Sequence, residues 1–120
     1  MNILNLNVKL ISKLENIDYT LKGKYNKAKE EITYYEQDEL NTKVKFNYEN
    51  NMLIRENKNL YLEYKFINNE ETKGKIYIKE LNKQYEILIN TKSIKRDKNN
   101  IEIEYILDNI NYKYIIREKD

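Results

Sequence analysis

Apolar and polar residues alternate almost continuously from about Thr42 to the end of the chain. In the clearest stretch, an apolar side chain recurs at every second position, at Ile101, Ile103, Tyr105 and Leu107. After a two-residue gap the pattern continues with Ile110, Tyr112, Tyr114 and Ile116. A period of two over about six residues is typical of a β-strand with one buried face. A chain built mostly of such segments is expected to form an all-β domain.

About ten strands follow from this alternation and from the turn residues between them. They span residues 3–13, 17–25, 31–37, 44–48, 52–56, 60–66, 74–78, 85–89, 100–107 and 110–117. Asparagine tolerates the left-handed backbone of tight turns, which predicts turns near residues 50–51, 68–69, 82 and 108–109. Gly23 predicts a bend or bulge inside its strand, and Gly74 is expected to open a later strand.

Three segments are less regular. Residues 1–15 also fit a helix, because Leu6, Leu10 and Leu14 recur at helical spacing. Residues 26–31 have good helix propensity, which predicts a turn or a short helical excursion there, with a helix over 26–39 as the alternative. The polar segment 95–100 is expected to be the longest loop.

Short connections between consecutive strands favour antiparallel pairing in chain order. We therefore predict a single domain over residues 1–120, an up-and-down antiparallel β-barrel of roughly 8–10 strands, lipocalin-like or calycin-like in form. Such a barrel is either filled by its own side chains or holds one small ligand.

The composition excludes several kinds of chemistry. The 120 residues include no His and no Cys, so Ser-His and Cys-His nucleophilic sites and the usual zinc sites are ruled out. The two glycines stand alone, so there is no glycine-rich phosphate loop. We therefore expect no cofactor, no metal and no enzymatic activity.

The charge pattern gives little sign of a charged partner. The net charge is +2 with 35% charged residues, and both signs are mixed along the chain. This mixture gives no strong field for nucleic acid or membranes. No segment resembles a signal peptide or a membrane span, and a cytoplasmic location is expected.

The tyrosines are the best candidates for a binding site. There are twelve, against two Phe and no Trp. Tyr64, Tyr105, Tyr112 and Tyr114 lie on the apolar faces of their strands, where phenols that converge could line a pocket for a small, mostly apolar ligand. Alternatively, these tyrosines fill the rim of the core. Arg55, one of three arginines, is a weaker candidate that could bind a carboxylate or phosphate, or form a structural ion pair.

Two charged groups have simpler explanations. Glu102 and Glu104 share a strand face, as paired acid–base carboxylates could, but a solvated face is the preferred interpretation. A basic cluster (Lys92, Lys95, Arg96 and Lys98) faintly suggests single-strand nucleic-acid binding. Asp97 interrupts that cluster, and a solvated loop is favoured.

Several segments together resemble the YwiB-like family, small bacterial calycin-like β-barrels without an assigned biochemical function. The resemblance covers roughly residues 6–118. It rests on the order of the strands and on residues 21–25, 32–36, 41–45, 53–55 and 101–105. Asn57 stands where the family pattern has a glycine, and the loops are short for the family. The resemblance implies a barrel fold and brings no active site.

Three functional hypotheses remain. The leading one is a non-enzymatic bacterial cytoplasmic barrel that binds a small apolar ligand in its interior. The second is a nucleic-acid or ribonucleoprotein accessory module, which needs lysines and tyrosines on one outer face. The third is an enzyme that uses tyrosine, carboxylate and arginine, which requires Arg55 or a carboxylate buried beside a pocket. The sequence does not indicate an oligomeric state.

Overall fold

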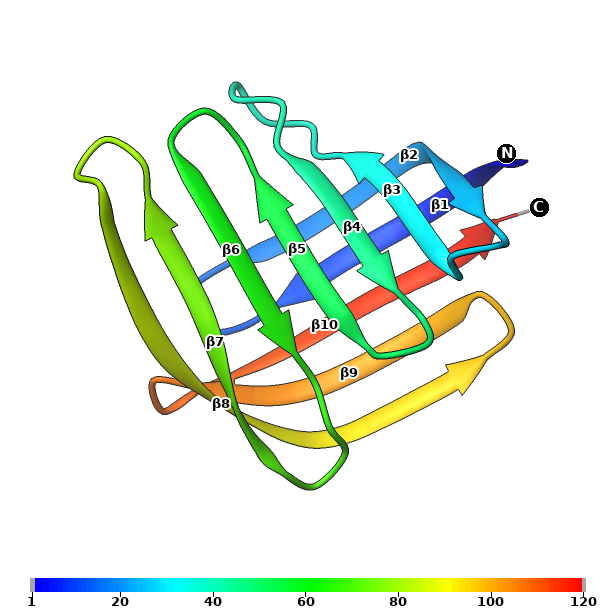
Figure 1. Ribbon diagram of the computed structural model, residues 1–120. Coiled ribbons are helices and arrows are strands. Elements are labelled where there is room, and N and C mark those ends of the chain that lie inside the picture. Colours follow the sequence, from blue (N-terminus) through cyan, green and yellow to red (C-terminus); the bar gives the residue numbers. More distant parts are fainter. Residues whose placement is uncertain (1, 120) are drawn as a thin grey trace.

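The computed structural model describes residues 2–119, and these form a closed antiparallel barrel of ten strands (Figure 1). The strands are β1 (Asn2–Ile11), β2 (Asn16–Asn26), β3 (Glu31–Tyr35), β4 (Lys43–Asn47), β5 (Met52–Glu56), β6 (Leu60–Lys65), β7 (Glu71–Ile78), β8 (Lys83–Asp97), β9 (Asn100–Leu107) and β10 (Ile110–Lys119). Each strand pairs with the next in the chain, and β1 pairs with β10 to close the ring. The predicted all-β up-and-down barrel is confirmed.

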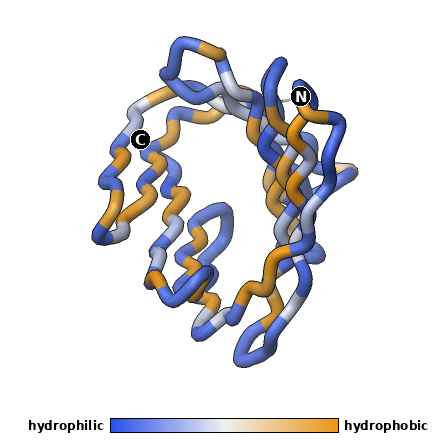
Figure 2. The backbone as a smooth tube through the Cα atoms, turned by 90° about the vertical axis from the view of Figure 1, so that its left-hand side faces the viewer, coloured by the Kyte–Doolittle hydropathy of each residue, from blue (hydrophilic) through white to orange (hydrophobic). Residues whose placement is uncertain are grey.

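The period-two pattern sets which side chains point inward. Along β9, Ile101, Ile103 and Tyr105 are buried, while the intervening Glu102 and Glu104 are only half-buried. Figure 2 shows the same alternation as a change of hydropathy along the strands, with mostly hydrophilic turns. The core is therefore the lumen of the barrel, and the outer wall carries the polar positions.

The predicted asparagine turns are confirmed. Asn51, Asn69 and Asn82 have positive φ, as do both Asp108 and Asn109 between β9 and β10. Two consecutive left-handed residues match the turn whose twist suits an antiparallel hairpin, and they need residues that tolerate φ > 0. The chemistry of these turns thus fixes the register of the hairpins.

The helical alternatives are wrong, because residues 2–11 form β1 and residues 27–30 form a turn that leads into β3. β1 ends at Ile11 rather than at residue 13, since the Ser12 hydroxyl accepts hydrogen bonds from the backbone N–H groups of Leu14 and Glu15, both at 3.1 Å. β3 likewise ends at Tyr35 rather than at residue 37.

The loop predicted at residues 95–100 is also wrong. β8 continues to Asp97, and Lys95 and Arg96 pair with Glu102 and Ile101 of β9. These polar residues lie near the end of a strand, where both faces meet solvent, so their polarity does not mark a loop.

The glycines have a different role from the one predicted. The register of β2 runs unbroken through Gly23, and Gly74 lies inside β7 rather than at its start. A Cβ at Gly74 would lie 2.9 Å from side-chain atoms of both Tyr64 and Ile89, so close packing requires glycine there. The register shift falls instead between Thr91 and Ser93, in the long, curved β8 (Figure 1).

Candidate functional site

One end of the lumen is packed solid. Near the turn between β4 and β5, Tyr48 packs edge-on against Phe46 with ring centroids 5.1 Å apart. The guanidinium carbon of Arg96 lies 5.3 Å from the Tyr48 ring centroid, and the Tyr48 hydroxyl donates to the Asn99 carbonyl at 2.9 Å. Aromatic rings and a cation over their face therefore close this end.

A cavity of about 110 Å³ lies inside the barrel. It includes Glu15 from the β1–β2 turn and Glu36, which directly follows β3. In an up-and-down barrel these two connections lie at the same end, opposite the β4–β5 turn. The cavity is thus nearest the end that Tyr48 does not close.

The lining is mostly aliphatic and aromatic. Aliphatic side chains come from five positions, Val8, Leu10, Ile17, Leu53 and Leu107. Every residue proposed from the sequence also lines this cavity, namely Arg55, Tyr64, Tyr105, Tyr112 and Tyr114. The structure thus brings together residues from β5, β6, β9 and β10.

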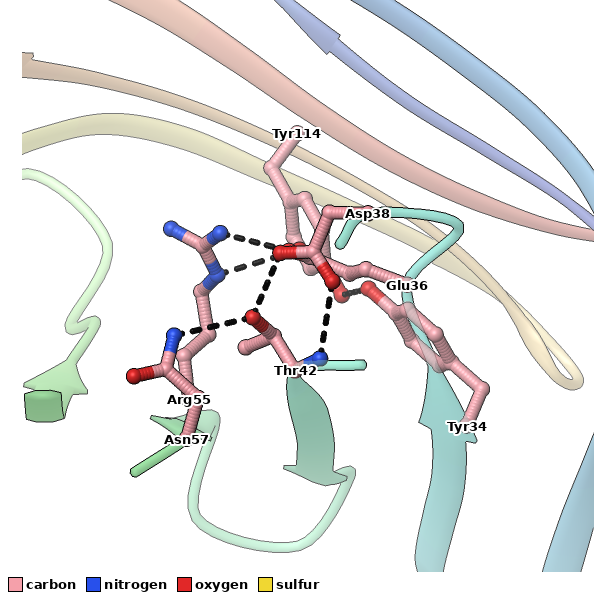
Figure 3. Close-up of polar contacts among 7 residues, drawn as sticks. All are labelled: Tyr34, Glu36, Asp38, Thr42, Arg55, Asn57 and Tyr114. Carbon is pink, nitrogen blue, oxygen red and sulfur yellow. Dashed lines mark hydrogen bonds and ion pairs between the residues drawn. The ribbon is translucent and has the colours of Figure 1, made fainter. Parts of the chain in front are cut away.

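Arg55 forms a two-pronged ion pair with Glu36 in the cavity wall (Figure 3). Its Nη2 and Nε lie 2.6 and 3.0 Å from the two carboxylate oxygens. The side chains are 29% and 10% exposed, respectively. Burial alone would lower the pKa of Arg55, but the hydrogen bonds and charge of Glu36 outweigh burial and raise it. Arg55 therefore stays a cation that its partner neutralises.

The loop between β3 and β4 holds Glu36 in place. The Glu36 backbone N–H donates to the Thr42 carbonyl at 2.8 Å. Asp38 accepts from the Thr42 hydroxyl at 2.6 Å and from its backbone N–H at 2.9 Å (Figure 3). These bonds, the hydroxyl first, lower the pKa of Asp38. Asn57 also donates to the Thr42 hydroxyl, which joins the loop to the β5–β6 turn.

The tyrosines make two kinds of contact. The hydroxyls of Tyr34 and Tyr114 lie 2.6 Å apart and satisfy each other in the core (Figure 3). Tyr105 and Tyr112 stack with their ring centroids 5.2 Å apart and their planes at 10°. Burial raises the pKa of Tyr64 to about 12 and also raises the pKa of Tyr105, so both phenols stay neutral near pH 7.

Four phenol hydroxyls of the lining are available to a ligand. Those of Tyr19, Tyr64, Tyr105 and Tyr112 make no hydrogen bond to any other group within residues 2–119. They are not sealed in the core either, since the buried side-chain atoms without partners are Asn51 Oδ1 and Thr91 Oγ1. With Arg55, they give the cavity a few hydrogen-bonding groups on an apolar wall.

The cavity is also lined by four residues that were not predicted as site residues from the sequence, namely Glu36, Tyr34, Tyr19 and Glu15. One signal could have found Glu36, because it lies two and four residues after Tyr34 and Ile32 and so follows their inward face. Glu15 lies in a turn, where alternation gives no information.

The other charged groups lie outside the cavity. Glu102 and Glu104 of β9 form ion pairs with residues of the neighbouring β10. Glu102 lies 3.8 Å from Arg117, and Glu104 lies 3.6 Å from Lys113. This agrees with the predicted solvated face. Arg96 of the basic cluster is engaged at the closed end, where its Nη2 lies 3.5 Å from Glu30 and its Nη1 bonds the Tyr48 carbonyl.

Residues 2–119 contain neither a cluster of metal-ligating side chains nor a helix that could cross a membrane. No group of three or more His, Cys, Asp or Glu side chains is placed to hold a metal ion. Over the same residues, no helix has the length and hydrophobicity to span a bilayer.

Comparison with solved structures supports the fold. The crystal structure of the YwiB protein from Bacillus subtilis matches with a TM-score of 0.72 and 22% identity, over 98% of this chain and 92% of that one. No protein-family model and no curated protein matches the chain. The predicted resemblance to YwiB is therefore confirmed for the fold.

Proposed function

We propose that this protein binds a small, mostly apolar ligand inside its barrel. The observation that carries the proposal is the cavity of about 110 Å³ in an otherwise packed lumen. An apolar cavity of about 150 Å³ can hold benzene, so a body about the size of one six-membered ring is appropriate here. Apolar walls with a few convergent polar groups are typical of small-molecule sites.

Binding without catalysis is the form of the proposal that the site supports best. The requirement of the enzyme hypothesis is met, because Arg55 and Glu36 lie beside the cavity. Yet each of these two groups is occupied by the other, and the nearby phenols hold their protons firmly. A general acid or base needs a pKa near the working pH, which these phenols do not offer.

The proposal extends to family and location. We infer membership of the YwiB-like calycin group, supported by the shared fold and by the order of local segments. A cytoplasmic location is supported by the lack of cysteine. The nucleic-acid alternative gains no support from the basic cluster, because Arg96 bonds the Tyr48 carbonyl and lies over the Tyr48 ring.

Two neighbouring residues on β5 offer a matched test. Leu53 lines the cavity, whereas Ile54 faces outward between Lys45 and Glu63. Toluene and phenol at millimolar concentration should shift amide resonances around the cavity in the wild-type protein. Leu53→Phe should abolish the shifts by filling the space, and Ile54→Phe should keep them. The proposal fails if neither probe shifts a cavity resonance, or if both variants bind equally well.

Native mass spectrometry tests the natural ligand directly. Protein isolated gently from its own host should carry a retained small molecule, and the Leu53→Phe variant from the same host should carry less of it. Equal retention by the two proteins would place any bound molecule outside the cavity.

A further inference from the structure

The charged groups at the cavity define the kind of ligand it favours. Of its lining residues, three carry a full charge, namely Arg55, Glu36 and Glu15. Arg55 and Glu36 cancel each other in their two-pronged ion pair. Glu15 forms no ion pair with any residue in 2–119, so the cavity retains one unbalanced negative charge.

Glu15 is held at the open side of the cavity. Its backbone carbonyl accepts from the Ser12 N–H at 2.8 Å, and its own N–H donates to the Ser12 hydroxyl, which makes the turn compact. Besides burial, its charge raises the pKa of Tyr112 more than any other charge does. At Tyr64 and Tyr105, where burial has the largest effect on the pKa, the Arg55 cation acts more strongly than Glu15 and in the lowering direction. Glu15 is an exposed residue, so it borders both the solvent and the cavity.

The tyrosines add to the same preference. The faces of aromatic rings attract cations, and neutral phenol oxygens can also accept a hydrogen bond from an ammonium group. Tyr105 and Tyr112 stack on each other, and Tyr64 lies edge-on to Tyr105 at 6.3 Å. These three rings are thus in contact through Tyr105 in the lining of the cavity that Glu15 also borders.

An anionic ligand meets two obstacles. It would lie near the unbalanced charge of Glu15, and it could take the Arg55 side facing Glu36 only by leaving that carboxylate unpaired in a largely buried position. Arg55 retains unused N–H groups, which suit a neutral oxygen atom as well as an anion.

We propose that the cavity selects small organic cations, protonated amines or quaternary ammonium groups on an apolar body about the size of one ring. The apolar body would lie among Val8, Leu53 and Leu107, and the cationic group would lie between Glu15 and the Tyr112 ring. This inference rests on the proposed function, since it identifies the ligand class of the same cavity.

Three probes of equal size separate charge from shape. Benzylamine, benzyl alcohol and benzoate share the ring and are cationic, neutral and anionic at pH 7. Isothermal titration should give the tightest binding for benzylamine, with benzoate weaker by about tenfold or more, as expected for one charge at a partly exposed site. Raising the salt concentration should narrow this difference.

Glu15→Gln tests the residue. This change should weaken the binding of benzylamine by several fold and leave the affinity for benzyl alcohol unchanged. Glu39→Gln is the control, because it removes the same charge from a loop at the same end without touching the cavity, and it should change little.

The outcomes separate the two proposals. Benzoate binding as tightly as benzylamine, or Glu15→Gln acting no differently from Glu39→Gln, would overturn the cation inference and leave ligand binding intact. If none of the three probes binds the folded protein, the proposed function fails and the inference fails with it.

Discussion

The effects of Arg55 and Glu36 on the free energy of unfolding should depend strongly on each other, because the two side chains form an ion pair. We consider Arg55→Met, Glu36→Leu and the double variant, which replace charged side chains by apolar ones of similar length. Either single change leaves one charge without its partner beside the cavity, and the Glu36 side chain is only 10% exposed. The double change removes both charges together.

The magnitudes follow from burial. Breaking a buried ion pair costs about 3–5 kcal/mol, while replacing both partners by apolar groups is often neutral. Because the Arg55 side chain is 29% exposed, water can relieve part of the loss. We therefore expect the free energy of unfolding to fall by about 3 kcal/mol for Arg55→Met and by about 2 kcal/mol for Glu36→Leu. For the double variant it should fall by only about 1 kcal/mol.

Urea unfolding gives the free energy of unfolding of the wild-type protein and the three variants. Far-ultraviolet circular dichroism is the probe, because the chain lacks tryptophan for fluorescence. Equal slopes with denaturant would show that the variants unfold in the same way. A double variant as unstable as the sum of the single ones would refute the argument. It would mean that the pair is solvated and does not isolate Arg55 from an anionic ligand.

Other predictions concern the core, pH and metals. Ile103→Ala should cost about 2–5 kcal/mol, because Ile103 is fully buried, whereas Ile106→Ala on the outer wall should cost well under that; a loss below about 0.5 kcal/mol for Ile103→Ala would contradict the inward face. Burial raises the pKa of Tyr64 to about 12, so its contribution to stability is complete below about pH 10 and is lost as the pH rises toward 12. Burial raises the pKa of Tyr34 as well, which acts in the same direction. Absorbance of phenolate during alkaline titration should therefore rise together with unfolding, and buried tyrosines that ionise in the native fold would contradict this. Chelators should change neither stability nor ligand binding, and a stoichiometric, tightly bound zinc ion in tag-free protein would overturn this expectation.

Alternation and turn chemistry made most of the fold predictable, because each is a local property. Ile101, Ile103 and Tyr105 could be assigned to one face without knowledge of their partners, and Asp108–Asn109 could be placed as a turn by its tolerance of positive φ. The loop at residues 95–100 was predicted wrongly, since the pairing of Lys95 and Arg96 with β9 depends on a distant segment.

The site was predictable only in part for the same reason. The inward direction of the tyrosines follows from the alternation. The rarity of arginine in this chain made Arg55 a candidate. The partner of Arg55 could not be predicted, because Glu36 lies nineteen residues away and meets it only across β4. Glu15 belongs to a turn, and only the curvature of the whole barrel places it beside Tyr64, Tyr105 and Tyr112.

The pairing of β1 with β10 has a consequence for how the chain is made. Residues 5–11 find their second neighbour only among residues 113–119, almost the whole chain away. During synthesis β1 and β2 can pair early, yet one edge of β1 stays open until the last strand has left the ribosome. Closure is therefore a late event, and such distant pairings slow folding. Asn5 pairs with Lys119, so β1 begins beside the end of β10 (Figure 1). A version of residues 2–119 joined at these ends and cut in the β7–β8 turn could therefore rebuild the same ring from a different starting point.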